Sequence, residues 1–542
     1  MKVFKNNDLL NWNDIVIFSK QKRANQLLKS QFGKEYPNKI NGQDVFTKNK
    51  TKSLNPANPE EVVGIFQKSG KDDAEIAIQA AAAAFESWKN VPVRKRAEFL
   101  TKAAYEIRRN RVEICSWMTA ESGKNFIEAD GDLCEAVDFL EFYALEAKRY
   151  AKLQPLTQMK NEINKYFYIP LGVGVCIPPW NFPFAIMIGI TAAALVTGNT
   201  VVLKPSSETP MMAWLFSDIM YKLGLPDGVL NFLVASGAEA GDYLVEHPKT
   251  RFISFTGSME VGLRINELAA KASPMPDVQH LADVGHLIYG DVQHRQIWIK
   301  RVIAEMGGKD TIIVDSEVED LDVAVADVVA SAYGFQGQKC SACSRVIVDA
   351  AVYDEFNKKL KLAVEKLQVG DPTEDYKIGP VISAKAEKTI LEYIEIGKKE
   401  GKLLCGGTKV AGLPGYYIQP TVFIDIDPKA RISQEEIFGP VLAVIKSNNF
   451  EHALEIANNT IYGLTGAVFT KNRDKIELAT NQFHVGNLYF NRKCTGAMVD
   501  VHPFGGFNMS GTDSKAGSRD YLMLFQQGKL VSEKVIKQRK IK

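Results

Sequence analysis

The chain has 542 residues, of which 46% are hydrophobic and 24% charged, and its formal net charge is +2. These values are ordinary for a globular protein, and so small a net charge predicts no electrostatic steering toward nucleic acid or a membrane surface. We therefore expect two or three domains that act on small molecules, with neither nucleic-acid binding nor membrane insertion.

The first fifty residues are basic and rich in amide side chains, which predicts an N-terminal extension over residues 1–50 that packs on the surface. The start of the chain shows no continuous apolar stretch of the kind found in a secretory signal. The longest apolar runs, residues 80–85 and 186–196, fall well short of the ~20 residues that span a membrane. We therefore expect a soluble protein with a cytoplasmic location.

Residues 73–153 are predicted to be mainly helical. Residues 74–85 are strong helix formers without Gly or Pro, and residues 94–109 and 134–150 carry apolar side chains at spacings of three and four. Further along, short apolar and β-branched runs alternate with helical stretches and are expected as strands: residues 172–177, 200–203, 229–234, 252–255, 311–314, 344–348 and 441–445. This alternation indicates βαβ units, so the predicted fold class is α/β with two parallel-sheet domains.

The seven cysteines are scattered and odd in number, which is typical of a reducing compartment and not of a disulfide framework. Cys340 and Cys343 form a C-x-x-C pair that could belong to a zinc site or a redox pair. No second C-x-x-C and no nearby His-x-x-x-His completes a metal set, so no metal is expected.

Three residues on separate segments could form a covalent catalytic site. Cys340 stands among small, polar and flexible residues and directly follows Lys339, whose charge would favour the reactive thiolate. Glu305 ends an apolar run just before a double glycine, and Asn181 lies between two prolines. A thiol, a carboxylate and an amide are suited to nucleophilic catalysis, with the active site between the two domains.

In these motifs the chain resembles the aldehyde dehydrogenase superfamily, from about residue 55 to about residue 533. The resemblance implies a Rossmann-like cofactor domain, a second α/β catalytic domain and a small oligomerisation element. It also implies that Cys340 is the nucleophile, Glu305 the general base and Asn181 an oxyanion donor. Residues 491–499 and 502–506 are similar to the branch that oxidises glutamate semialdehyde, the 1-pyrroline-5-carboxylate dehydrogenases.

The resemblance and the change of pattern along the chain together predict the domain boundaries. We expect the extension over residues 1–50, a NAD-binding domain over 51–304, a catalytic domain over 305–510 and a C-terminal oligomerisation or return segment over 511–542. An oligomerisation hairpin is expected near residues 152–170. A segment near 273–292, with His280, His286 and His294 in or beside it, is longer than the family pattern and reads as a surface excursion or an interface element.

The cofactor-binding residues are expected at strand ends and in one glycine turn, since helix N-terminal amides favour phosphate. The resemblance implies that Lys204 meets the adenosine ribose. Ser207 would not repel a 2′-phosphate, so NAD is expected with NADP tolerated. The resemblance also implies that Glu436 accepts ribose hydroxyls and that Phe438 packs near the nicotinamide. The full expected set is Ile177, Pro179, Trp180, Lys204, Ser207, Gly257, Ser258, Val261, Glu436 and Phe438.

The carboxylate of the aldehyde substrate needs a receptor, and closely spaced backbone N–H groups form such anion sites. The expected substrate-binding residues are Ser341, Thr495, Gly496, Ala497 and Phe507. Asp500 departs from the glycine expected in this anchor loop, and its carboxylate would weaken binding of an acidic substrate unless it faces solvent.

Two other functions remain open. The same machinery could oxidise a different aldehyde, or the chain could be a cysteine hydrolase or acyltransferase without redox chemistry. A cysteine hydrolase usually pairs its thiol with a histidine. The catalytic half contains His452, His484 and His502, and none of them lies in a motif that indicates a catalytic histidine. The resemblance further implies a homo-oligomer and, as a candidate partner, a proline dehydrogenase.

Overall fold

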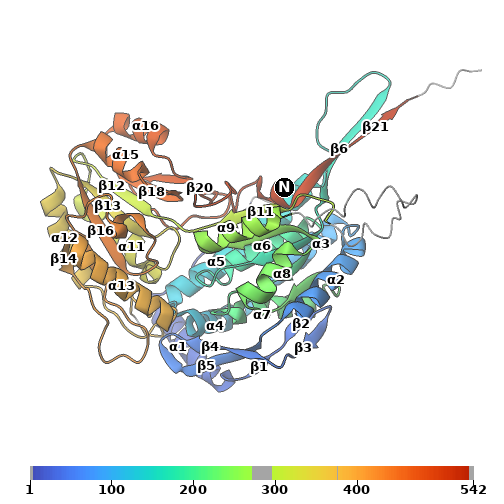
Figure 1. Ribbon diagram of the computed structural model, residues 1–542, viewed down its shortest axis with the longest axis horizontal. Helices are drawn as coiled ribbons and strands as arrows, with labels where there is room; N and C mark the ends of the chain where they lie inside the picture. The colour runs from blue at the N-terminus through green and yellow to red at the C-terminus, as the bar shows by residue number, and fades with distance from the viewer. Residues whose placement is uncertain (1–3, 272–295, 375, 536–542) are drawn as a thin grey trace, which may run out of the picture.

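The computed structural model describes residues 4–271, 296–374 and 376–535. Two seven-stranded sheets form the centres of two α/β lobes, which lie side by side in Figure 1. Most neighbouring strands within each sheet are parallel, so the predicted α/β fold class is confirmed. The segment expected as an excursion near 273–292, with its three histidines, lies outside the described residues.

The first lobe is built on a sheet with the strand order β11-β10-β7-β8-β9-β2-β3. Its strands are β2 (Asn38–Ile40), β3 (Gln43–Val45), β7 (Val173–Ile177), β8 (Thr200–Leu203), β9 (Leu230–Phe232), β10 (Thr250–Thr256) and β11 (Arg301–Glu305). Its helices are α2 (Lys71–Trp88), α3 (Val93–Arg109), α4 (Arg111–Ser122), α5 (Phe126–Tyr150), α6 (Ala185–Val196), α7 (Pro210–Lys222), α8 (Asp242–Glu246) and α9 (Met259–Ala270). The helical stretch and all four strands predicted for this region are present.

The first fifty residues are more integrated than the predicted surface extension. After α1 (Ile15–Leu28), strand β2 pairs antiparallel with β9, and β3 pairs with β2, so the segment completes one edge of the first sheet. A small third sheet joins β1 (Glu35–Tyr36), β5 (Asn58–Gln67) and β4 (Lys50–Asn55). The partner of β2 within the large sheet, β9, lies far away in sequence, which is why local composition did not indicate this pairing.

The second lobe is built on a sheet with the strand order β14-β15-β16-β13-β12-β18-β19. Its strands are β12 (Asp310–Val314), β13 (Cys343–Asp349), β14 (Lys402–Cys405), β15 (Thr421–Ile424), β16 (Val441–Ser447), β18 (Thr465–Phe469) and β19 (Asn487–Phe490), and β17 (Tyr462–Gly463) pairs separately with β20 (Phe507–Asn508). Its helices are α11 (Leu321–Tyr333), α12 (Tyr353–Glu365), α13 (Ala384–Glu400), α14 (Arg431–Gln434), α15 (Phe450–Asn458) and α16 (Arg473–Gln482). The three strands predicted after Glu305 are all present.

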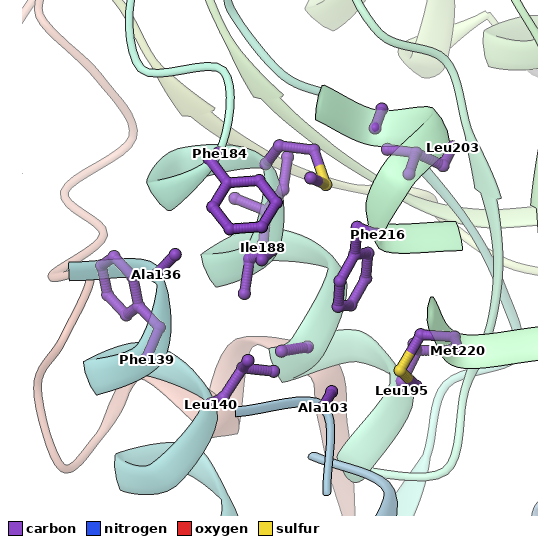
Figure 2. Close-up of a cluster of buried hydrophobic side chains, with 14 of the residues drawn as sticks. Ala103, Ala136, Phe139, Leu140, Phe184, Ile188, Leu195, Leu203, Phe216 and Met220 are labelled. Atoms are coloured by element: carbon purple, nitrogen blue, oxygen red, sulfur yellow. The ribbon is translucent and has the colours of Figure 1, made fainter. Parts of the chain in front are cut away.

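A large apolar core in the first lobe fixes helix α6, which follows the loop that carries Asn181. All residues of α6 except Ile186 are buried, and a helix that is apolar on every side belongs in an interior. In Figure 2, Phe184 and Ile188 lie between Phe139 of α5 and Phe216 of α7. The loop that carries Asn181 therefore ends at a helix that is tightly packed in the core.

A two-stranded arm extends from the first lobe (Figure 1). The hairpin expected near 152–170 is not formed as a local hairpin, because within that segment only one bridge joins Gln154 to Tyr166. Strand β6 (Glu162–Pro170) instead pairs along its whole length with β21 (Gln526–Lys534) near the other end of the described chain. In the described parts of the chain, no helix combines the length and apolar character needed to cross a membrane.

Candidate active site

The predicted site residues come together where the two sheets meet. Strand β11 ends at Glu305, β7 ends shortly before Asn181, and β10 ends at the turn that starts α9, so all three approach from the carboxyl edge of the first sheet. The backbone N–H of Gly257 in that turn donates to the carbonyl of Glu305 at 3.1 Å. The nucleophile loop reaches the same region from the second lobe, immediately before β13.

Cys340 lies at the end of a loop with unusual backbone geometry. Phe335 and Gln336 both adopt positive φ, at 49° and 57°, a region that side chains with a Cβ seldom occupy. Although part of Cys340 reaches the surface, burial raises the pKa of its thiol, and the carboxyls of Asp310, Glu436 and Glu305 raise it further. The thiol of this structure is therefore protonated at neutral pH.

Lys339 does not activate the thiol in the way the sequence suggested. Its ammonium lies 2.8 Å from a carboxylate oxygen of Glu128 on α5, so its charge is neutralised by a partner on another element. Burial alone would raise the pKa of Glu128, but Lys339 and Lys124 hold it below its usual value. Because this ion pair balances the charge, the expectation that Lys339 favours the thiolate of Cys340 is not supported; Glu128 as a partner could not be read from local sequence.

Asn181 is buried, and its side-chain Nδ2 donates to the carbonyl of Gln338 at 3.1 Å. Gln338 precedes Cys340 by two residues, so the amide already faces the nucleophile loop. The side chain of Gln338 accepts from the backbone N–H of Ile382 at 2.8 Å, which attaches the same loop to the second lobe. This placement suits a donor that turns toward an oxygen on a substrate bonded to Cys340.

Glu305 is held by residues that sequence reasoning missed. Ser514 Oγ donates to Glu305 Oε1, and the N–H of Gly506 donates to Oε2 at 3.4 Å. Burial raises the pKa of Glu305 to about 8, although Ser514, Gly506 and Lys515 each oppose the rise. The carboxyl can therefore exchange a proton near neutral pH, as a general base requires.

The double glycine after Glu305 makes room for Glu436. A Cβ on Gly307 would lie 2.2 Å from an oxygen of Glu436, so a side chain there would displace the carboxyl. Glu436 Oε1 accepts from the N–H of Gly308 at 3.0 Å, and burial raises the pKa of Glu436 to about 7. The expected ribose-binding carboxyl thus rests directly on the turn that follows the expected general base.

The other expected cofactor residues lie along the carboxyl edge of the first sheet. Lys204 follows β8 and is buried, and burial lowers its pKa to about 8. Among the described residues, its Nζ donates only to the carbonyls of Ala235 at 3.3 Å and Pro205 at 3.4 Å. Ser207, three residues after Lys204, is exposed. Ser258 is the N-cap of α9, with its Oγ accepting from the N–H of Val261 at 3.4 Å.

Aromatic side chains connect the cofactor edge to the nucleophile loop. The ring of Trp180 lies 5.4 Å from Phe438 and 6.5 Å from Phe335, both in edge-on geometry. Phe438 has a φ of 58°, and its ring contacts that of Trp180. Ile177 ends β7, and Pro179 lies in the same loop as Trp180. These three expected cofactor residues therefore lie close together, with Phe438 against Trp180.

The anchor loop presents unpaired backbone N–H groups, as expected of an anion site. Arg492 donates to the carbonyls of Thr495 at 2.9 Å and Gly496 at 3.3 Å, and Gly496 has a φ of 78°. Within the described residues, no acceptor takes the amide hydrogens of Thr495, Gly496 or Ala497. These three groups remain available to a carboxylate.

Ser341 and Phe507, the other expected substrate residues, come from the two sides of this loop. Ser341 is nearly buried, and its carbonyl accepts from the thiol of Cys494 at 3.4 Å, which connects the nucleophile loop to the anchor loop. Phe507 in β20 lies with its ring 5.1 Å from that of His484 and under the ammonium of Lys515.

Asp500 is neutralised by Arg519, so the expected repulsion of an acidic substrate is not supported. Its carboxylate lies 3.1 Å from Arg519 Nε and 3.3 Å from Nη2. Asp500 also adopts a φ of 61°, and its N–H donates to the carbonyl of Gly517. Asp500 and Arg519 are 19 residues apart in the sequence, so no local sequence pattern predicts their ion pair.

The alternatives drawn from cysteine and histidine find little support in the geometry. Cys343 lies buried in β13 and interacts with Cys494, not with Cys340. Both ring nitrogens of His502 have other partners, since Nε2 lies 3.1 Å from Arg492 and Nδ1 accepts from the N–H of Met498. Among the described residues, no group of three or more His, Cys, Asp or Glu side chains could hold a metal ion.

The chain belongs to the aldehyde dehydrogenase family, whose model matches residues 45–531. A protein of Anoxybacillus flavithermus named 1-pyrroline-5-carboxylate dehydrogenase is 55% identical over 507 residues, 93% of this chain and 94% of that protein. A protein of the same name from Bacillus subtilis is 52% identical over 505 residues, 93% of this chain and 94% of that protein. The resemblance inferred from the motifs, including the branch, is confirmed.

Solved structures of the family superimpose closely on this chain. A 1-pyrroline-5-carboxylate dehydrogenase from Thermus with bound NAD has a TM-score of 0.93 at 46% identity, covering 98% of this chain and all of that one. A betaine aldehyde dehydrogenase from Staphylococcus aureus in complex with NAD+ has a TM-score of 0.86 at 29% identity, covering 96% and 99% of the two chains. The whole two-lobed architecture, and not one domain alone, is shared.

Proposed function

We propose that the protein oxidises L-glutamate 5-semialdehyde, the open form of 1-pyrroline-5-carboxylate, to L-glutamate with NAD as the oxidant. The observation that carries this proposal is the meeting of Cys340, Glu305 and Asn181 beside a loop with three backbone N–H groups that have no acceptor among the described residues. The close relatives bear the name of this activity, which supports the same substrate.

The cofactor site fits a dinucleotide. Lys204 offers a buried ammonium with long hydrogen bonds to two carbonyls, which a ribose hydroxyl can replace. The first turn of α9 provides backbone N–H groups for a diphosphate. Glu436 can accept hydroxyl hydrogens of a second ribose, and the exposed Ser207 leaves room for a 2′-phosphate, so NADP would be tolerated.

The first half of the reaction forms a bond between sulfur and carbon. The thiol of Cys340 gives up its proton to solvent. The resulting thiolate attacks the aldehyde carbon, and the electron pair of the carbonyl moves to its oxygen. The Nδ2 of Asn181 and the N–H of Cys340 donate to that oxyanion, and one such donor contributes about 3–4 kcal/mol in comparable sites. When bound, NAD supplies the positively charged hydride acceptor that converts the thiohemiacetal to a thioester.

The second half of the reaction releases the product. Glu305 takes a proton from water, the resulting hydroxide attacks the thioester carbonyl, and the carbon–sulfur bond breaks to return the Cys340 thiolate. Because Ser514 and Gly506 hold the carboxyl of Glu305 at the loop of residues 505–514, the side chain must turn toward the thioester for this step. The acid product leaves as a carboxylate.

The substrate's own carboxylate distinguishes this aldehyde from others. We propose that the N–H groups of Thr495, Gly496 and Ala497 bind it, with the hydroxyl of Ser341 beside them and Phe507 against the aliphatic chain. A neutral aldehyde of the same length would leave these N–H groups without a charged acceptor, which costs affinity. An aldehyde panel measured with both NAD and NADP tests the proposal, and a preference for a neutral aldehyde would contradict it.

We also propose that the protein is a homo-oligomer in which the β6–β21 arm packs against a second copy. The arm exposes Ile163, Leu530 and Val531, and two isolated strands are marginally stable in water without a further surface to cover them. Its two edges also leave backbone N–H and C=O groups available for pairing. Light scattering of the whole chain and of a Leu530→Glu variant tests this assembly.

A proline dehydrogenase is the proposed partner, because oxidation of proline would produce the cyclic imine from which the substrate forms. A solved protein described as proline utilization A covers 99% of this chain at 39% identity, while this chain covers 54% of that longer one. We propose a cytoplasmic location, which the seven free cysteines support because they suit a reducing compartment.

A further inference from the structure

A fully buried ion pair lies beside the two catalytic loops. Lys124 Nζ, in the turn between α4 and α5, lies 2.7 Å from Asp132 Oδ2, and both side chains are 0% exposed. Removing two charges from water costs about as much as their attraction returns, so such pairs seldom add to stability. The contacts of the pair therefore indicate a geometric role.

Asp132 holds the end of the Asn181 loop. Its second oxygen, Oδ1, accepts from the backbone N–H of Ala185 at 2.6 Å. Ala185 is the first residue of α6, and its N–H has no partner within the helix. Asn181 precedes it by four residues, and α6 itself is fixed in the core (Figure 2). The carboxylate of Asp132 thus fixes the point at which the loop that carries Asn181 meets α6.

Lys124 holds both loops by their aromatic side chains. Its ammonium lies 4.0 Å from the ring centroid of Phe182, the neighbour of Asn181, and 4.7 Å from that of Phe335 in the nucleophile loop. A buried cation–π contact contributes about 2 kcal/mol and depends on the ring's position. One ammonium therefore connects the loop that carries the oxyanion donor to the loop that carries the thiol.

A second ion pair from the same helix completes the connection. Glu128, four residues before Asp132 on α5, pairs with Lys339, the neighbour of Cys340. The hydrogen bond from Asn181 Nδ2 to the carbonyl of Gln338 joins the two loops directly. The start of α5 thus contacts the nucleophile loop and the donor loop at the same time.

We propose that Lys124 and Asp132 are positioning residues that fix the distance between the amide of Asn181 and the sulfur of Cys340. The inference rests on the proposed roles of Asn181 and Cys340 in aldehyde oxidation. Neither Lys124 nor Asp132 touches the substrate, since both are closed off from solvent. They act through Phe182, Phe335 and Ala185.

The test is the pre-steady-state burst of reduced cofactor in Lys124→Met and in the double variant Lys124→Met/Asp132→Asn. The double variant removes both charges and keeps an oxygen for the N–H of Ala185, so it folds even where the single variant leaves Asp132 unpaired. The burst rate constant should fall about 10- to 100-fold in both, because an error of about 1 Å in the catalytic geometry has that effect. Binding of NAD, read by fluorescence titration, should stay unchanged.

Arg111→Met is the matched control. Arg111 of α4 lies 2.5 Å from Asp130, which belongs to α5 like Asp132. Asp130 is as deeply buried as Asp132. Asp130, however, accepts from the N–H of Leu10 and from Trp12, so this pair holds the N-terminal segment and not the catalytic loops. This variant should lower the Tm and leave the burst rate constant unchanged. An equal loss in the control, or an unchanged burst in both Lys124 variants, would overturn the proposal.

A readout without substrate separates this inference from the proposed function. If wild-type protein gives no burst with glutamate semialdehyde, the proposed function fails. The alkylation rate of Cys340 by iodoacetamide, followed by peptide mass with Cys340→Ala as the blank, still tests the positioning. It should rise in the Lys124 variants, where looser loops expose the thiol, and stay at the wild-type value in Arg111→Met. Unchanged alkylation in the Lys124 variants would overturn the inference on its own.

Discussion

Ser514 donates a hydrogen bond to the carboxyl of Glu305 across a sequence separation of 209 residues. The serine belongs to a loop that also places Gly506 on the second carboxyl oxygen. The expected general base is therefore fixed by the last third of the chain, although its strand belongs to the first lobe.

Replacing Ser514 by alanine should make Glu305 a base that works only at higher pH. The hydroxyl opposes the rise in the pKa of Glu305, and hydrogen bonds to charged groups contribute about 1.5–3 kcal/mol, which corresponds to about one to two pH units. The pH midpoint of thioester hydrolysis should move upward by about this amount, and Ser514→Thr, which keeps a hydroxyl, should stay near wild type. An unmoved midpoint in the alanine variant would show that this hydrogen bond is absent in the working enzyme.

The pH dependence of the wild-type protein should show the raised pKa of Glu305. The pKa of Glu305 is about 8, so at lower pH the carboxyl is largely protonated and cannot take a proton from water. Thioester hydrolysis should therefore speed up as the pH rises through 8 and then level off. The steady-state rate after the burst measures this step. Glu305→Gln should retain the burst and lose the pH-dependent turnover; equal loss of both phases would indicate a structural role.

Cys340→Ala should remove aldehyde oxidation and leave the fold intact. The residue lies on a partly exposed loop, and deletion of its sulfur creates little cavity. Thermal unfolding should match wild type while the burst disappears. More than trace oxidation by the purified variant would exclude the covalent mechanism.

Ser207→Glu should increase the preference for NAD over NADP. The exposed position would place a carboxylate beside a 2′-phosphate, a repulsion of ~1 kcal/mol or about fivefold in the ratio of kcat/KM values. Ser206→Glu adds the same charge one residue away and serves as the control. A ratio that does not change would mean that Ser207 does not face the ribose.

Arg519→Ala should weaken binding of the acidic substrate, because it leaves the charge of Asp500 unbalanced near the anchor loop. Arg519 is largely exposed, so solvent screens the effect to about 0.2–1 kcal/mol, an increase in KM of up to about fivefold. The double variant Asp500→Asn/Arg519→Ala should restore the wild-type KM. A neutral aldehyde of similar length should respond to neither change; a response there would point to a shift of the loop.

The sequence predicted the helices and strands well where their signals were local. Residues 172–177 and 311–314 are strands as expected because their apolar, β-branched runs suit buried parallel strands. The pairing of residues 38–40 with β9 and of β6 with β21 was not predicted, since register between distant segments leaves no local pattern.

For the candidate site, the motifs indicated the chemical groups but not their electrostatic partners. Lys339 next to Cys340 was expected to lower the thiol pKa, yet its position opposite Glu128 reverses that reasoning. Asp500 on its own predicts repulsion of an acidic substrate, whereas Arg519 beside it balances its charge. A charge acts on whatever lies near it in space, and for both residues that partner comes from another element of the fold.

The pairing of β6 with β21 also sets an order of events during synthesis. Residues 162–170 leave the ribosome long before residues 526–534 exist, and at roughly 5–20 residues per second the delay is on the order of 20 to 70 seconds. During that time the edge of β6 that pairs with β21 stays open. The nascent protein must therefore complete both lobes before its arm can form, so subunits can recognise one another through the arm only after translation of β21.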